Sequence, residues 1–156
     1  QAAQVGHADI GPLRLGADVH QHRVRVGGLE VRRGARVTPP LPAWDSLSLT
    51  AVELRILPAD WSAALMHWRG VYLIVDEADG ARYVGAAYGA ENLLGRWRAH
   101  VAGEAGVTAQ LARRATTRFR FSILELLSPT APPEEVVERE RNWMDRLHTR
   151  THGLNA

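Results

Sequence analysis

Apolar and polar residues alternate most clearly between Gly70 and Gly85, and this stretch predicts a β-hairpin. Residues 71–76 follow a period of two, and Asp79-Gly80 is a strong turn signal. If the strands pair so that their faces coincide, the hydroxyls of Tyr72 and Tyr83 stand close together. The pattern by itself leaves open a plain structural hairpin whose two tyrosines only pack against a neighbouring element.

Similar patterns predict the other elements. Residues 22–33 alternate around Gly27-Gly28 and indicate a second hairpin, and Thr50 with Glu53 suits the capping box of a short helix. The spacing of apolar residues predicts helices over residues 91–102 and 108–114, a strand over 118–126 and a last helix opened by two prolines at 132–133. We therefore expect an α+β fold: a small three-stranded antiparallel sheet flanked by helices, with a hairpin and short helices before it.

The composition of the 156 residues narrows the class of protein. The length suits one domain, or a core with an extension. The chain has no cysteine, which excludes disulfides, thiolate zinc sites and a cysteine nucleophile. No apolar run reaches the length of a membrane span, and the N-terminus lacks the layout of a signal peptide. We expect a soluble, cytoplasmic protein without a membrane partner.

The charge is informative in kind more than in amount. The net charge is +2, and all 19 lysine-plus-arginine positions are arginine. The planar guanidinium suits phosphate oxygens and stays charged at any relevant pH, so this usage is compatible with a nucleic-acid partner. A GC-rich genome that encodes arginine by default explains the same usage, and this alternative stays open.

Three side chains are candidates for chemistry beside the tyrosines. Arg96 and His100 lie four residues apart and so share one face of the predicted helix over residues 91–102. Glu140 falls inside the apolar stripe of the last helix, where a carboxylate is costly unless it meets a cation. A buried salt bridge to an arginine and a metal site both account for Glu140 at this level.

With these residues in view, the chain resembles the GIY-YIG nucleases over about residues 68–156. The two tyrosine motifs are separated by ten residues between the tyrosines, as is typical of that family. Each motif alone occurs by chance, whereas six elements in the right order and spacing are specific. The six elements are Gly70-Val71-Tyr72, Tyr83-Val84-Gly85, Arg96, His100, Glu140 and Asn155.

The resemblance implies an endonuclease that hydrolyses DNA phosphodiester bonds with one divalent ion, Mg²⁺ or Mn²⁺. In that family's scheme the glutamate holds the metal, the arginine stabilises the scissile phosphate and a tyrosine takes the proton of the attacking water. Carried over, these roles fall to Glu140, Arg96 and Tyr72, with His100 accepting or hydrogen-bonding the phenolic proton. Tyr83 would position the water or the phosphate, Gly85 would leave space for the approach, and Asn155 would fix local structure near the metal.

The resemblance also divides the chain and leaves several expectations. Residues 1–67 are predicted to be an N-terminal extension that packs on a nuclease domain of residues 68–156, with a monomer and a homodimer both open. The link from Gly85 to Arg96 is longer than in simple members of the family. Many relatives carry a histidine or an asparagine in the loop after the arginine helix, whereas residues 103–110 of this chain read GEAGVTAQ. A catalytically impaired nucleic-acid-binding module is therefore the alternative to an active enzyme, for which a restriction or defence role is favoured because no separate DNA-binding domain is evident. Predicted DNA-backbone contacts are Arg98, Arg113, Arg114, Arg118 and Arg120.

Overall fold

The computed structural model describes residues 23–26, 29–32, 38–104 and 107–156. The chain divides into two compact units, Gln1–Thr38 and Pro39–Ala156. In the first unit, β1 (Arg23–Val26) pairs antiparallel with β2 (Leu29–Arg32), which confirms the predicted N-terminal hairpin; its Gly27-Gly28 turn lies outside the described residues. The second unit holds all the candidate site residues.

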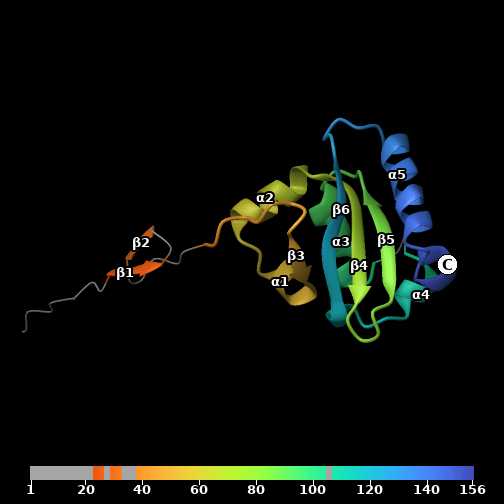
Figure 1. Ribbon diagram of the computed structural model, residues 1–156, viewed down its shortest axis with the longest axis horizontal. Helices are drawn as coiled ribbons and strands as arrows, with labels where there is room; N and C mark the ends of the chain where they lie inside the picture. The colour runs from red at the N-terminus through yellow and green to blue at the C-terminus, as the bar shows by residue number, and fades with distance from the viewer. Residues whose placement is uncertain (1–22, 27–28, 33–37, 105–106) are drawn as a thin grey trace, which may run out of the picture. The chain divides into compact units, whose positions relative to one another are not determined.

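A four-stranded antiparallel sheet forms the centre of the second unit (Figure 1). Its spatial order is β3 (Ser48–Thr50), β6 (Phe119–Leu127), β4 (Arg69–Asp76) and β5 (Arg82–Ala87). The prediction of three strands is thus wrong by one, because β3 has only three residues and runs directly into a helix. So short a strand carries no recognisable period, and its pairing with β6 is a long-range contact.

The hairpin of β4 and β5 confirms the central prediction from the sequence. Tyr72 pairs with Gly85 and Ile74 pairs with Tyr83, so the two tyrosines lie on the same face, offset diagonally by two positions. Gly80 in the turn adopts a φ of 77°, a conformation that glycine reaches without a steric penalty. The register therefore places both phenols toward the same layer of the unit.

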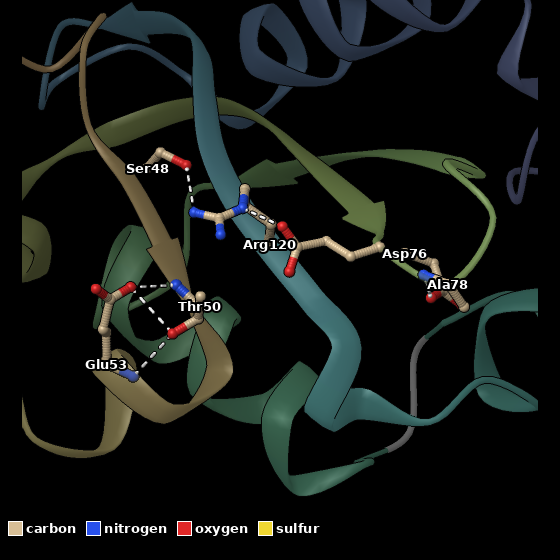
Figure 2. Close-up of polar contacts among 7 residues, drawn as sticks. Ser48, Thr50, Glu53, Asp76, Ala78 and Arg120 are labelled. Carbon is tan, nitrogen blue, oxygen red and sulfur yellow. Dashed lines mark hydrogen bonds and ion pairs between the residues drawn. The ribbon is translucent and has the colours of Figure 1, made fainter.

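The helices that the sequence predicts are present in the expected order, and two short elements, η1 and α6, were not predicted. The capping box is present at α1 (Ala51–Arg55): the Glu53 N–H donates to the Thr50 hydroxyl, and the Thr50 N–H donates to the Glu53 carboxylate (Figure 2). The other helices are α2 (Ala59–His67), α3 (Asn92–Ala102), α4 (Ala109–Ala112), the 3₁₀ turn η1 (Thr116–Arg118), α5 (Pro133–Arg146) and α6 (Thr149–His152).

The main core lies between the sheet and α3. Tyr72, Ile74 and Phe121 come from the strands and Trp97 from α3, and all four are fully buried. Val71 alternates with Tyr72 along β4 and is also fully buried, so both faces of the strand are covered. Helix α5 contacts β4 and β5, and Figure 1 shows it beside β5. The consequence is that β5 lies where α3 and α5 approach the same edge of the sheet.

Residues 39–67 belong to the same compact unit as the sheet. Strand β3 pairs with β6, and α2 packs against α3. The functional boundary between residues 67 and 68 stays a prediction. Within the described part of the chain, no helix is both long and apolar enough to cross a membrane.

Candidate active site

A cavity of about 510 Å³ opens where β5, the loop after it, α3 and α5 meet. Three of the residues predicted to carry chemistry line it, namely Tyr83, Arg96 and Glu140. The other lining residues are Ala86, Ala87, Tyr88, Gly89, Ala90, Glu91, Asn92, Gly95 and Ala99. Side chains from three separate elements therefore converge on one solvent-accessible space, which is the arrangement expected of a binding or catalytic site.

Tyr72 and His100 meet behind this cavity. The Tyr72 hydroxyl lies 2.6 Å from His100 Nε2, and the two side chains are almost completely buried. Burial lowers the pKa of His100 to about 4, helped by the positive charge of Arg96, so the imidazole is neutral at pH 7. A neutral imidazole accepts the phenolic hydrogen bond at one nitrogen, and this contact holds the Tyr72 ring in place.

Gly85 lies directly beneath the Tyr72 ring. A Cβ atom at position 85 would lie 2.3 Å from the Tyr72 hydroxyl and 2.3 Å from its Cζ, well inside van der Waals contact. Tyr72 thus occupies the room that this glycine leaves, and a role for Gly85 in the approach of substrate stays a prediction. The space above this glycine is filled by the phenol of Tyr72, the residue paired directly with Gly85 across the hairpin.

Tyr83 and Arg96 form the polar wall between the buried pair and the cavity. Burial raises the pKa of the Tyr83 phenol, and the nearby Arg96 guanidinium opposes that rise. For Tyr72, burial again raises the pKa well above its usual value, Tyr83 adds to the rise, and Arg96 opposes it. Arg96 is half-buried; burial would lower its pKa, but hydrogen bonding and charge at Tyr72 and Tyr83 hold it above the usual value. One fixed cation thus acts on both phenols.

Glu140 presents a half-buried carboxylate to the same cavity. Burial raises its pKa, while the charge of Arg96 and a hydrogen bond from the backbone N–H of Ala86 act in the opposite direction. The described residues contain no cluster of three or more histidine, cysteine, aspartate or glutamate side chains for a metal. A single carboxylate beside an open cavity does fit magnesium, which keeps most of its water ligands. The residues present are therefore compatible with one divalent ion at Glu140.

Asn155 ties the end of the chain to the strand that carries Tyr83. Its side-chain oxygen accepts from the Val84 N–H at 2.8 Å, and its side-chain NH₂ donates to the Val84 carbonyl at 2.8 Å. The Leu154 N–H also donates to the carbonyl of Arg82, at 2.8 Å. These bonds satisfy the free side of β5, an edge strand, on either side of Tyr83. Asn155 is thus placed to support the wall of the cavity.

Two of the arginines predicted to contact DNA pair with carboxylates of the β4–β5 turn instead of lining the cavity. Arg114 Nη1 lies 3.0 Å from Asp76 Oδ2 and 2.6 Å from Asp79 Oδ2. Arg120 pairs with Glu77 and donates to the Ser48 hydroxyl (Figure 2). These contacts give both arginines a structural role at this end of the hairpin.

The side chains of Arg98, Arg113 and Arg118 are exposed, and none of the three lines the cavity. Their contact with DNA stays a prediction.

Three residues of this site were missed by the sequence analysis. Tyr88 and Glu91 line the cavity from the loop between β5 and α3, and Arg69 holds that loop from the start of β4. The available signal was the unusual length of the link between Gly85 and Arg96. A long connection next to candidate catalytic residues is a common place for substrate contacts.

Comparison with known proteins adds an independent finding. Residues 69–155, more than half of the chain, match the family described as the GIY-YIG catalytic domain. No curated protein matches the chain significantly in sequence. Among solved structures, the chain is similar to a mutant of the catalytic domain of the intron endonuclease I-TevI, at 25% identity over 56% of this chain and 92% of the other, with a TM-score of 0.46. A second structure, the catalytic domain of the homing endonuclease I-TevI, has 26% identity over 56% of this chain and 96% of the other, with a TM-score of 0.45.

Proposed function

The chain belongs to the GIY-YIG catalytic-domain family and is an endonuclease, and we propose that it hydrolyses DNA phosphodiester bonds using one divalent ion held by Glu140. The observation that carries the proposal is the cavity in which Tyr83, Arg96 and Glu140 converge. Hydrolysis of a phosphodiester needs an oriented water, positive charge near the phosphate and help for the leaving oxygen. Tyr83 can orient the water, Arg96 supplies the positive charge, and Glu140 can hold an ion that helps the leaving oxygen.

Arg96 is proposed to bind the scissile phosphate. Its guanidinium stays charged at every relevant pH and presents a planar fork to two phosphate oxygens. Because it is half-buried beside the phenols, it acts where water screens charge poorly. Its contribution therefore grows as negative charge develops on the phosphate in the transition state.

Tyr83 is proposed to contact the attacking water, with Tyr72 acting behind it. Tyr83 lines the cavity, whereas Tyr72 is fully buried and its hydroxyl faces His100. The direct role assigned to Tyr72 on family resemblance thus passes to Tyr83. Burial raises the pKa of both phenols, so both are neutral at pH 7. Tyr83 then orients the attacking water by a hydrogen bond, and the proton of that water leaves to the solvent of the open cavity. His100, neutral and hydrogen-bonded to Tyr72, holds that phenol in place behind Tyr83.

Glu140 is proposed to hold the ion through its carboxylate. A bound magnesium or manganese ion supplies Lewis-acid stabilisation of the phosphate and leaving oxygen. Arg96 also acts on the pKa of Glu140, so both groups address the same part of the cavity. Asn155 supports this arrangement by fixing β5, and it needs no contact of its own with substrate.

The test is cleavage of supercoiled plasmid by the purified chain with Mg²⁺, with Mn²⁺ and with EDTA. We expect nicked or linear product only with a divalent ion, and recovery when the ion is restored to the EDTA-treated protein. A double variant, Arg96→Ala with Glu140→Ala, controls for contaminating nucleases and should give no product. Equal cleavage in EDTA would contradict metal dependence. DNA binding without cleavage under any divalent ion would instead favour the catalytically impaired module.

A further inference from the structure

The loop between β5 and α3 shares the candidate active-site cavity but has no part in the chemistry assigned above. Tyr88 and Glu91 both line the cavity together with Arg96 and Glu140. Tyr88 is 41% exposed, and it is the only tyrosine among the exposed large hydrophobic residues of the described chain. The Tyr88 ring therefore lies against the cavity and is partly open to a ligand.

The backbone that carries Tyr88 is held firmly. Arg69 donates to the Tyr88 carbonyl at 3.2 Å, to the Asn92 side-chain oxygen at 3.4 Å and to the carbonyl of Ala131. The Asn92 side chain donates in turn to the Met66 carbonyl at 2.8 Å. The half-buried guanidinium of Arg69 therefore anchors the loop to the start of β4 and to the segment around Ala131. Presenting the Tyr88 ring to a ligand costs little additional ordering of the chain.

Glu91 places a carboxylate along the same wall. It directly precedes α3, and a Cβ built at Gly95 would lie 2.5 Å from the Glu91 Cβ and 3.0 Å from its Oε2. The carboxylate thus folds over the bare glycine, one turn into the helix. A carboxylate repels a phosphate but accepts hydrogen bonds from the exocyclic amino group of a base. Arg96, the residue after Gly95, is a cation and therefore attracts a phosphate.

From this division of the cavity we infer that Tyr88 and Glu91 form a subsite for one nucleobase next to the scissile phosphate. The inference rests on the proposed function. The phosphate lies toward Arg96, the base stacks on the Tyr88 ring, and its exocyclic amino group donates to Glu91. Stacking on an aromatic ring tolerates any base, whereas the carboxylate selects cytosine, adenine or guanine over thymine, which has no amino group. The subsite takes an unstacked base, because a ring face cannot reach a base inside the helical stack.

The first test is sequencing of cleavage ends from a random-sequence DNA pool. For the parent we expect thymine to be depleted at one fixed position beside the cut. Glu91→Gln should relax that position, because its amide also donates a hydrogen bond and accommodates the carbonyl groups of thymine. Tyr88→Ala should raise KM about tenfold with little change in kcat, and Tyr88→Phe should keep the parent value, since the ring face carries the contact. Cutting by the parent without any base preference, or unchanged KM in Tyr88→Ala, would overturn the subsite.

A second test does not depend on cleavage. Single-stranded DNA containing 2-aminopurine, which fluoresces less when stacked and carries an exocyclic amino group, is titrated with the protein in Ca²⁺. The parent and Tyr88→Phe should quench the fluorescence, and Tyr88→Ala should not. Quenching with this pattern in a protein that fails to cut plasmid would contradict the proposed catalysis and support the subsite. Equal quenching by all three proteins, or quenching by none, would contradict the subsite whether or not plasmid is cut.

Discussion

The two ends of the β4–β5 hairpin both bring arginine to acidic side chains, with different outcomes. At the turn, Arg114 lies within 3.0 Å of Asp76 and 2.6 Å of Asp79, and Asp76 is only 2% exposed. At the other end, Arg96 lies among two phenols and acts on Glu140 across a cavity of about 510 Å³. The cluster of Arg114, Asp76 and Asp79 closes the turn on itself, and we call it the closed end. The cavity lined by Tyr83, Arg96 and Glu140 leaves room for a ligand, and we call it the open end.

This difference is the reason we propose Arg96, and not Arg114, for the chemistry. An arginine held by a carboxylate at hydrogen-bond distance has its charge balanced within the protein, and the pair fixes local geometry. Arg96 acts on two phenols and on Glu140 beside an open cavity, and we propose that a phosphate binds in that cavity. The composition does not separate the two cases, because every lysine-or-arginine position of this chain is arginine.

Removing Arg96 tests the open end with the largest expected effect. Arg96→Ala should reduce the rate of plasmid cleavage about 1000-fold, because a preorganised cation at the phosphate is lost. Single-turnover rates measure this, with Arg55→Ala on α1 as the control for loss of one exposed positive charge. A parent-like rate in Arg96→Ala, or an equal loss in Arg55→Ala, would show that the cavity is not where the phosphate binds.

The two tyrosines sharpen the comparison within the open end. Tyr83→Phe should slow cleavage roughly 100-fold, because Tyr83 lines the cavity and its hydroxyl is proposed to orient the attacking water. Tyr72→Phe should slow it less, and should cost about 1 kcal/mol of unfolding free energy through the lost hydrogen bond to His100. Cleavage rates and urea unfolding of both variants distinguish the roles. A larger rate loss in Tyr72→Phe would return the direct role to Tyr72.

At the closed end, we expect removal of Arg114 to change the stability of the protein and not its cleavage rate. Arg114→Ala removes the partner of the buried Asp76 carboxylate and should lower the midpoint of urea unfolding. Arg114→Ala combined with Asp76→Asn should recover part of the loss, because the amide leaves no unpaired charge. If Arg114→Ala unfolds at the parent midpoint, the ion pairs at the turn do not fix the hairpin.

For His100 we expect a smaller effect, which is a dependence of the unfolding free energy on pH. Its folded-state pKa of about 4 lies below the usual 6.5, so the unfolded chain binds more protons between these values. Stability from this group is therefore complete above pH 6.5 and is lost as the pH falls toward 4, by roughly 2 kcal/mol between about pH 7 and pH 5. Urea unfolding at both pH values should show a weaker pH dependence in His100→Gln than in the parent. Identical pH dependence in the two proteins would mean that His100 is not buried as a neutral group.

Local patterns in the sequence predicted what depends on neighbours in the chain. The hairpin with its two tyrosines, the capping box at Thr50 and the order of helices follow from periodicity and turn residues. The convergence of Arg96 and Glu140 came from family spacing, since nothing local brings α3 and α5 together. Strand β3 was missed because its partner β6 lies about 70 residues away.

The remaining gaps concern how space is filled. The sequence could not show which group packs over Gly85, because a glycine in a strand leaves room for any neighbour, and the register places Tyr72 there. Tyr88 and Glu91 carry no pattern of their own, and only the anchoring by Arg69 and the shared cavity place them at the site. Such placements depend on tertiary packing and on the volume left over by large side chains.

Glu140 offers the most direct test of whether the cavity lined by Tyr83, Arg96 and Glu140 is the endonuclease active site. The measurement is the single-turnover rate of plasmid cleavage at saturating Mg²⁺ for Glu140→Gln, beside Glu138→Gln, an exposed glutamate on the same helix. We predict a loss of at least roughly 100-fold in Glu140→Gln, with a parent-like rate in Glu138→Gln and native circular dichroism in both. A parent-like rate and Mg²⁺ dependence in Glu140→Gln would contradict the account.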